Sequence, residues 1–366
     1  MSVDDEAKLE QEEPDFIQTR FTPAVGEHRQ PQPAVLPRVV ASPSAPRVGV
    51  VGVGYLGQFH AEKYAAMEEA QLVGVVDLDH SRARQIAERF SCRALRSHRD
   101  LIEQVDAVSV VVPTQYHYQV TRDLLEAGIH VLVEKPMTTT VAEADALISL
   151  AETNGLVLQV GHLERFNPAV VAASEHVYQP YFVESHRLAS FTERGTEVDV
   201  ILDLMIHDID IILSLVPSHL EDLRVGGVNV LTPHTDIANV RLEFANGCIA
   251  NVTASRISAK KMRKIRIFQP DSYLSIDCAD KEVELFRKLA TRGSDGFPEI
   301  EYQRLSVAET DPLDEQLRAF LGSVLGGAKP LVGGQAGRKA LDVATRVSQL
   351  IQQQMERLGD SLGLGE

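Results

Sequence analysis

The sequence predicts an α/β protein in which a doubly wound parallel sheet is followed by an α/β domain with an antiparallel sheet. Between residues 47 and 162, short apolar runs alternate with helical segments, which is the βαβ pattern of parallel strands. Farther along, two runs of alternating polarity, 238–244 and 248–255, are joined by Asn246-Gly247, a strong hairpin signal. A chain of 366 residues also exceeds one ordinary core, so two domains are expected.

Composition and periodicity divide the chain into three segments. Residues 1–46 open with acids and hold seven of the 17 prolines, which predicts a disordered acidic and proline-rich tail. Residues 47–162 form the first domain and residues 163–366 the second. In the first we expect strands at 48–53, 72–77, 107–112, 131–133 and 156–160, with helices ending near 67 and spanning 81–90, 115–127 and 141–153. In the second we expect helices at 198–215, 312–325 and about 337–357.

Charge and cysteine content exclude several classes of function. The formal net charge of −16 argues against nucleic acid or an anionic membrane as partner, but leaves room for a local basic pocket and an anionic small ligand. Cys92, Cys248 and Cys278 lie far apart without CxxC spacing, so neither a metal site nor a disulfide framework is indicated. With no membrane-spanning run and no secretion signal, we expect a cytoplasmic protein.

A glycine-rich turn follows the first apolar run. Gly52-Val53-Gly54-Tyr55-Leu56-Gly57 matches G-x-G-x-x-G between a strand and an amphipathic helix, the context of a Rossmann dinucleotide site. Gly52 permits the tight turn, Gly54 lets the backbone approach a pyrophosphate, and Gly57 lets helix and strand pack closely. The helix N-terminus favours the anion, so Tyr55 and Leu56 at its start are also placed on the cofactor.

The second strand ends in Asp77, 20 residues beyond Gly57. A carboxylate there accepts hydrogen bonds from the adenosine ribose and repels a 2′-phosphate, which favours NAD over NADP. Arg82 and Arg84, just downstream, soften that preference. The turn after the next strand should also line the cofactor, with Pro113, Thr114 and His117 as candidates. A plain helix-start role for His117 is an equal alternative.

Glu134-Lys135-Pro136 ends the strand at 131–133. Ligands of open parallel sheets bind beyond the carboxyl ends of the strands, so Lys135 is placed at the edge of a ligand cleft. Proline cannot continue the ladder, and the chain turns away after it. The alternative is a solvated lysine. A dinucleotide site upstream favours a catalytic ammonium that stabilises a developing alkoxide.

The unusually apolar helix at 198–215 carries Asp203 and His207 four residues apart, on one helical face. Asp210 adds a third polar position on that face, while Asp208 points elsewhere. A core histidine held by a carboxylate is the alternative. Because oxidation of an alcohol needs a group near neutral pKa to take the hydroxyl proton, we expect His207 to be catalytic with Asp203 as its orienting partner. Whether Lys135 or His207 removes the proton stays open.

With these motifs in order, the chain resembles the Gfo/Idh/MocA oxidoreductase family over nearly its whole length after the tail. The resemblance implies a Rossmann domain followed by an α/β domain with an open, largely antiparallel sheet that often serves oligomer contacts, here in a homodimer or homotetramer. It also implies that Lys135 is the hallmark active-site lysine, His207 the acid/base and Asp203 its partner. Glu134 resembles the family residue near the nicotinamide ribose.

A finer resemblance comes from the segments 161–168 and 202–208. They are similar to those of UDP-N-acetylglucosamine 3-dehydrogenases, which act ahead of an aminotransferase in making 3-amino sugars for lipid A. Arg165 and Asn167 follow the strand that crosses between the domains, where a guanidinium and an amide suit sugar hydroxyls, an N-acetyl carbonyl or a phosphate. For Asn167 a helix-start role is an equal alternative.

The stretch 256–266, which begins at Arg256, is the densest basic cluster of this acidic chain. It suits the diphosphate of a UDP-sugar, although a solvated charge run is the usual explanation. Strand alternation places Arg263 and Ile265 on one face and Lys264 and Arg266 on the other, so not all of them can serve one ligand.

The leading hypothesis is NAD-dependent oxidation of the 3-hydroxyl of UDP-N-acetylglucosamine, a UDP-linked amino sugar, to a 3-keto sugar. Another sugar or cyclitol dehydrogenase is the first alternative, for example a UDP-N-acetylglucosaminuronate 3-oxidase, which needs an extra cation for the substrate carboxylate. A non-catalytic NAD-binding redox-sensing regulator is the second, and the presence of Lys135 and His207 argues against it.

Overall fold

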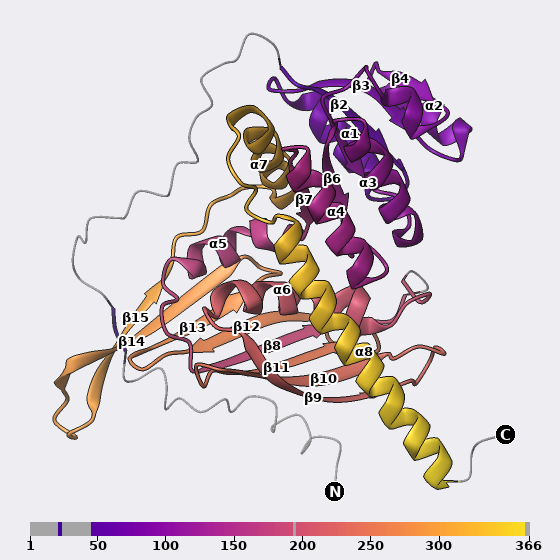
Figure 1. Cartoon of the computed structure of the whole chain (residues 1–366). Helices are drawn as coiled ribbons and strands as arrows, with labels where there is room; N and C mark the ends of the chain where they lie inside the picture. Colours follow the sequence, from indigo (N-terminus) through magenta and orange to yellow (C-terminus); the bar gives the residue numbers. More distant parts are fainter. Residues whose placement is uncertain (1–20, 24–44, 193–194, 363–366) are drawn as a thin grey trace, which may run out of the picture.

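The computed structural model describes residues 21–23, 45–192 and 195–362 (Figure 1). Apart from residues 21–23, 45 and 46, the tail expected over 1–46 therefore lies outside the described residues. Two sheets organise the rest of the chain, a six-stranded sheet built by the first domain and a nine-stranded sheet built mainly by the second. Among the described residues, no helix combines the length and the apolar character that a membrane crossing requires.

The first domain is the expected doubly wound parallel sheet, with strand order β4-β3-β2-β5-β6-β7 and parallel pairing throughout. Central strands are buried on both faces, which explains their continuous apolar runs. The strands are β2 Arg47–Val51, β3 Gln71–Val76, β4 Arg93–Leu95, β5 Ala107–Val110, β6 His130–Glu134 and β7 Leu158–Gly161. The helices are α1 Gly57–Ala66, α2 His80–Arg89, α3 His117–Glu126 and α4 Val141–Thr153, with 3₁₀ turns at His98–Leu101 and Thr114–Tyr116.

Helix α4 shows why helix boundaries could be predicted from the sequence. Thr140 accepts a hydrogen bond from the backbone N–H of Glu143, and the Glu143 carboxylate accepts one from the backbone N–H of Thr140. This capping box fixes the first residue of the helix. The helix predicted at 141–153 therefore matches the observed one.

The second sheet has the order β1-β15-β14-β13-β12-β8-β11-β10-β9 and is largely antiparallel, as predicted. Its parallel pairs are β1 with β15 and β8 with β11. The predicted hairpin is confirmed as β10 and β11. The strands are β1 Phe21–Pro23, β8 Phe182–Leu188, β9 Leu220–Val228, β10 Ile237–Phe244, β11 Ile249–Ser255, β12 Met262–Phe268, β13 Ser272–Asp277, β14 Glu282–Arg292 and β15 Pro298–Arg304.

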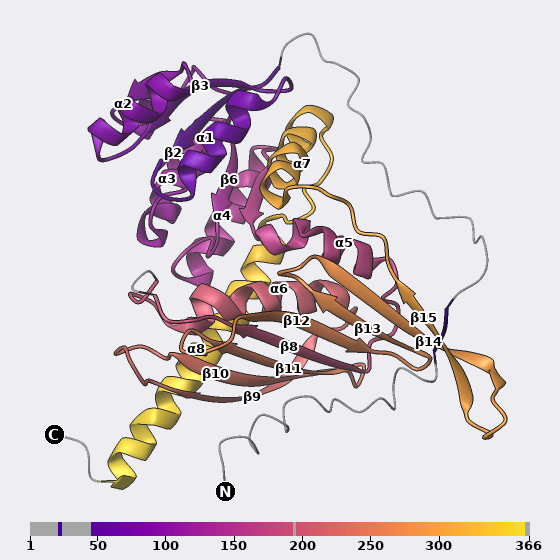
Figure 2. The same cartoon turned by 180° about the vertical axis from the view of Figure 1, so that it is seen from behind.

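Helices from the second domain lie on one face of this sheet, toward the first domain (Figures 1 and 2). They are α5 Pro168–Ser174, α6 Ile206–Leu215 and α8 Gly334–Leu362, with a 3₁₀ turn, η4, at Leu163–Phe166 and a π-helical turn, η5, at Ile201–Met205. Helix α7, Pro312–Gly326, instead returns to the first domain, where Leu317 and Phe320 pack in one core with Val48 and Val50. The two domains thus share packed elements, and the carboxyl edge of the parallel sheet faces α6.

Candidate active site

The glycine-rich turn between β2 and α1 has the shape that a bound dinucleotide requires. Gly52 adopts φ +87°, and a Cβ there would lie 2.5 Å from the carbonyl oxygen of Val111. A Cβ on Gly57 would lie 1.8 Å from the carbonyl oxygen of Gly52. At Gly54, by contrast, the Arg82 guanidinium at 3.7 Å is the only described group near a Cβ, so the turn leaves open space for a pyrophosphate beside the start of α1. Tyr55 is exposed beside this space.

Asp77 is held at the edge of the same turn. Its carboxylate accepts hydrogen bonds from the backbone N–H groups of Val53 and Asp79, each at 2.9 Å. The guanidinium of Arg82 lies 3.6 Å away. The residues present therefore fit a dinucleotide, with a fixed carboxylate where the adenosine ribose is expected.

His117 connects the turn after β5 to the Glu134-Lys135-Pro136 segment. Its Nδ1 lies 2.7 Å from the carbonyl oxygen of Pro136 and its Nε2 lies 2.7 Å from that of Val112. Burial lowers the pKa of His117, and a neutral ring donates only one of these two hydrogen bonds. In this structure the ring links two loops at the carboxyl edge of the parallel sheet. A cofactor contact by His117, Pro113 or Thr114 stays a prediction.

Glu134 points into the protein. Its carboxylate lies 3.4 Å from His60 of α1 and 3.4 Å from the side-chain amide of Gln316 of α7. Space for it exists because β7 offers Gly161, where a Cβ would lie 2.4 Å from the carboxylate. Burial alone would raise the pKa of Glu134, but His60 and the neighbouring Lys135 hold it below the ordinary value. His60 and Gln316 were not identified from the sequence, because neither belongs to a local pattern.

Lys135 reaches across the domain boundary to the π-helical turn. Its ammonium donates a hydrogen bond of 2.7 Å to the backbone carbonyl of Asp203 and lies 3.8 Å from the Asp203 carboxylate. This hydrogen bond joins the end of β6 to the π-helical turn that precedes α6. This contact was not predicted from the sequence, which paired Asp203 with His207.

The predicted contact between Asp203 and His207 is not observed. The His207 side chain is half-buried, and its buried Nδ1 has no hydrogen-bond partner among the described residues. The reason is local: Asp203 lies in a π-helical turn, which widens the helix, so the stacking of residues four apart no longer holds there. Asp203 accompanies Lys135 instead. Whether it also acts on His207 during the reaction stays a prediction.

A second histidine, His162, lies beside His207. The two rings meet edge to face with centroids 6.4 Å apart, and both ring nitrogens of His162 are buried without a hydrogen-bond partner among the described residues. Burial lowers the pKa of both histidines, that of His207 strongly and with help from the Lys135 charge. His162 had no predicted role, although it follows β7 as Lys135 follows the neighbouring β6.

The other predicted substrate contacts have observed structural partners. Arg165 lies 3.7 Å from Asp210. Asn167 caps α5 by accepting the N–H of Ala169, and its amide donates to the carbonyl of Cys278. Arg256 donates to backbone carbonyls of the loop between β8 and α6. Contacts of Arg165, Asn167 and Arg256 with substrate stay predictions.

Asp208 points away from this cluster, as expected. It forms a 2.7 Å ion pair with buried Arg187, whose guanidinium also lies 2.8 Å from Glu164. Arg263 lies 3.8 Å from Glu164 on the same face of the sheet, whereas Lys264 and Arg266 pair with Asp277 and Glu184. The basic stretch is divided between the two faces as predicted.

Within the described part of the chain, no group of three or more His, Cys, Asp or Glu side chains is placed to hold a metal ion.

Comparisons with known proteins agree with this geometry. Residues 46–162 match the family model described as "Oxidoreductase family, NAD-binding Rossmann fold", and residues 170–272 match the GFO/IDH/MocA C-terminal domain. The UDP-N-acetylglucosamine 3-dehydrogenase of Acidithiobacillus ferrooxidans is 38% identical over 312 residues, which cover 85% of this chain and 99% of that one. A myo-inositol 2-dehydrogenase of Thermotoga maritima is 27% identical over 81% of this chain and 93% of its own length.

Solved structures give the same result. That of the Acidithiobacillus ferrooxidans enzyme superposes with a TM-score of 0.78 at 38% identity and covers 83% of this chain and 96% of that one. A scyllo-inositol dehydrogenase from Lactobacillus casei with bound NAD(H) and scyllo-inositol has a TM-score of 0.71 at 18% identity, over 85% and 98% of the two chains. The chain therefore belongs to the Gfo/Idh/MocA family of oxidoreductases.

Proposed function

We propose that this dehydrogenase uses NAD to oxidise the 3-hydroxyl of UDP-N-acetylglucosamine to a 3-keto sugar. The observation that carries the proposal is the pairing of Lys135 with Asp203 at the carboxyl edge of the dinucleotide-binding sheet. The pair lies close enough to His162 and His207 for the Lys135 charge to lower the pKa of both histidines. The choice of substrate rests on the relative from Acidithiobacillus ferrooxidans, which carries that activity in its name and matches 85% of this chain.

The residues divide the chemistry between them. NAD held by the Gly52–Gly57 turn and Asp77 supplies the hydride acceptor. His207, kept neutral by burial and by the Lys135 charge, accepts the proton of the 3-hydroxyl. The Lys135 ammonium, anchored on the carbonyl of Asp203, stabilises the negative charge that develops on the oxygen. Of the two candidates for the proton acceptor, we therefore favour His207.

NAD is proposed over NADP because the Asp77 carboxylate is fixed by two backbone N–H groups where a 2′-phosphate would have to lie. Arg82, 3.6 Å from that carboxylate, is the cation that works against this preference. Comparing kcat/KM for the two cofactors tests the assignment. A preference for NADP would contradict it.

Incubation of the pure protein with NAD and UDP-N-acetylglucosamine tests the reaction, with reduced nicotinamide followed by its absorbance. Because alcohol oxidation by NAD can be unfavourable at equilibrium, the assay is repeated with a sugar aminotransferase that removes the keto product. Turnover is expected with the neutral sugar. Absence of turnover with every UDP-sugar in the coupled assay rejects the proposal, and faster turnover of UDP-N-acetylglucosaminuronate redirects it to the uronate.

A further inference from the structure

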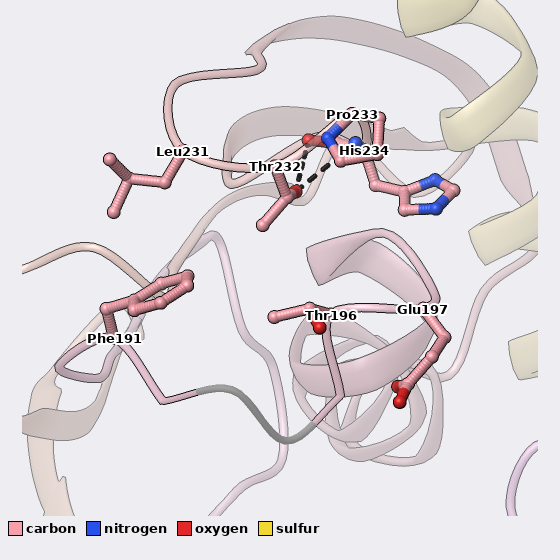
Figure 3. A pocket seen from close by; sticks show the side chains of 7 residues that line it. All are labelled: Phe191, Thr196, Glu197, Leu231, Thr232, Pro233 and His234. Carbon is pink, nitrogen blue, oxygen red and sulfur yellow. Dashed lines mark hydrogen bonds between the residues drawn. The ribbon is translucent and has the colours of Figure 1, made fainter.

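Two loops of the second domain border an open hollow of about 430 Å³ (Figure 3). The loop after β8 contributes Phe191, Thr196 and Glu197, and the loop between β9 and β10 contributes the stretch 231–234. Phe191 is 43% exposed and Leu231 is 60% exposed, which is unusual for side chains of their size. The residues assigned to catalysis and cofactor binding do not line it.

The hollow begins next to Asp203 and Lys135. Gly195, which precedes Thr196, has φ +79°, and a Cβ there would lie 2.8 Å from the Asp203 carboxylate. Asp203 in turn lies 3.8 Å from the Lys135 ammonium. A ligand whose reacting end lies at Lys135 can therefore extend along this loop into the hollow.

Two buried side chains, those of Arg256 and Asp236, anchor the two loops that line the hollow. The Arg256 guanidinium donates to the carbonyl oxygens of Gly195 and Val198, each at 2.8 Å, which fixes residues 195–198 of the first loop. The Asp236 carboxylate accepts three backbone N–H groups, those of residues 230–232, which fixes the second. The backbone N–H of Arg256 donates to the carbonyl of Asp236, so the two anchors are themselves joined. The basic stretch that the sequence singled out thus begins with a residue that builds the hollow.

The lining has the chemistry of a nucleoside subsite. In Figure 3, Phe191 and Leu231 lie at one end of the hollow, and the Glu197 carboxylate lies at the other. Exposed aromatic faces stack on nucleobases, and a carboxylate accepts hydrogen bonds from ribose hydroxyls. We propose that this hollow is the uridine subsite of the enzyme, in which Phe191 stacks on the pyrimidine and Glu197 accepts the ribose hydroxyls. The inference rests on the proposed function, because it assumes a UDP-linked substrate.

The loop between β11 and β12 carries cations that suit the diphosphate of the substrate. Ser258 donates its backbone N–H to the carbonyl of Ala189, so the loop between β11 and β12 runs beside the start of the Phe191 loop. Lys260 and Lys261 on that loop are exposed and form no ion pair with another described residue. They can neutralise a diphosphate that enters the site, whereas Arg256 is committed to the loop carbonyls.

The test compares Phe191→Ala with Phe297→Ala, which removes a still more exposed phenylalanine from the turn between β14 and β15. Binding of free UDP is measured by calorimetry, and turnover of UDP-N-acetylglucosamine is measured with NAD. For F191A we expect UDP to bind about tenfold more weakly and KM to rise by the same factor, with kcat nearly unchanged. F297A should match the wild type, and thermal melting shows whether both variants are folded.

A second variant tests the ribose contact. Wild type should bind UDP more tightly than 2′-deoxy-UDP, and Glu197→Ala should abolish that difference. UDP that fails to bind, or that binds equally to wild type and F191A, overturns the subsite even if the sugar nucleotide is turned over. UDP binding that depends on Phe191 without any turnover of UDP-sugars supports the subsite and rejects the proposed reaction.

Discussion

At His207, burial and the charge of Lys135 act in the same direction. Desolvation is the larger cause and the Lys135 ammonium the next, and both lower the pKa of the imidazole well below its ordinary value. A histidine that must be neutral to accept a proton is active above its pKa and inactive below it. The acid limb of the wild-type kcat/KM profile should therefore lie well below pH 6.5, the ordinary value for histidine.

Lys135→Met removes the neighbouring cation and so part of the shift. We expect activity to fall about a hundredfold or more, because the alkoxide loses its stabilising charge. In the residual activity the acid limb should move to higher pH, toward the ordinary histidine value. Lys135→Arg keeps a positive charge and should leave the limb near its wild-type position. A limb that does not move in K135M would show that Lys135 does not control the charge of His207.

At the scale of the element, the π-helical turn and the loop before it position the Asp203 carboxylate beside Lys135. Gly195 has φ +79° and leaves no room for a side chain beside Asp203. Gly195→Ala should therefore displace the Asp203 carboxylate and, through their 3.8 Å ion pair, the ammonium of Lys135. Because small displacements of catalytic groups are costly, we expect kcat to fall between about tenfold and a hundredfold.

Gly296→Ala is the matched control for this change. Gly296 has φ +82°, but nothing lies within 4 Å of its Cβ position. Both alanines should cost about 1–2 kcal/mol of backbone strain, visible in the free energy of unfolding. Only G195A should lose activity, and an equal loss of kcat in both variants would refute the positional role of the Gly195 loop.

The same elements show what could be read from the sequence. Helix α4, the glycine turn and the β10–β11 hairpin were predictable because capping residues, glycines and Asn246-Gly247 act locally. The π-helical turn carries no comparable local signal, so the pairing of Asp203 with His207 was expected where the structure pairs Asp203 with Lys135.

Contacts between distant segments explain the other differences. Arg256 is 61 residues from Gly195, and Arg187 is 21 residues from Asp208, so their buried bonds appear only once the sheet is assembled. His162 could have been found, because the rule that placed Lys135 beyond β6 applies equally to the residue beyond the adjacent β7.

At the scale of the whole molecule, the two faces of the nine-stranded sheet differ. The described helices α5, α6 and α8 cover one face, and no described helix covers the other (Figure 2). Five aromatic side chains cross that second face on neighbouring strands, with ring centroids 4.8–5.7 Å apart: Phe182, Phe268, Tyr273, Phe286 and Tyr302. A continuous aromatic row on a sheet face that no described helix covers is typical of a protein interface.

We propose that this face joins copies of the chain in a homodimer or homotetramer. Tyr273→Glu places a carboxylate in the middle of the aromatic row, where an interface would bury it without a partner, a strongly unfavourable arrangement. Light scattering after gel filtration should give a dimeric or tetrameric mass for the wild type and a smaller mass for the variant. Tyr116→Glu, at an exposed site in the first domain, should leave the mass unchanged. A monomeric wild type, or a Y273E variant of unchanged mass, would show that the aromatic row does not form an interface between copies of the chain. Turnover measured on the same fractions would show whether activity at Lys135 and His207 depends on association.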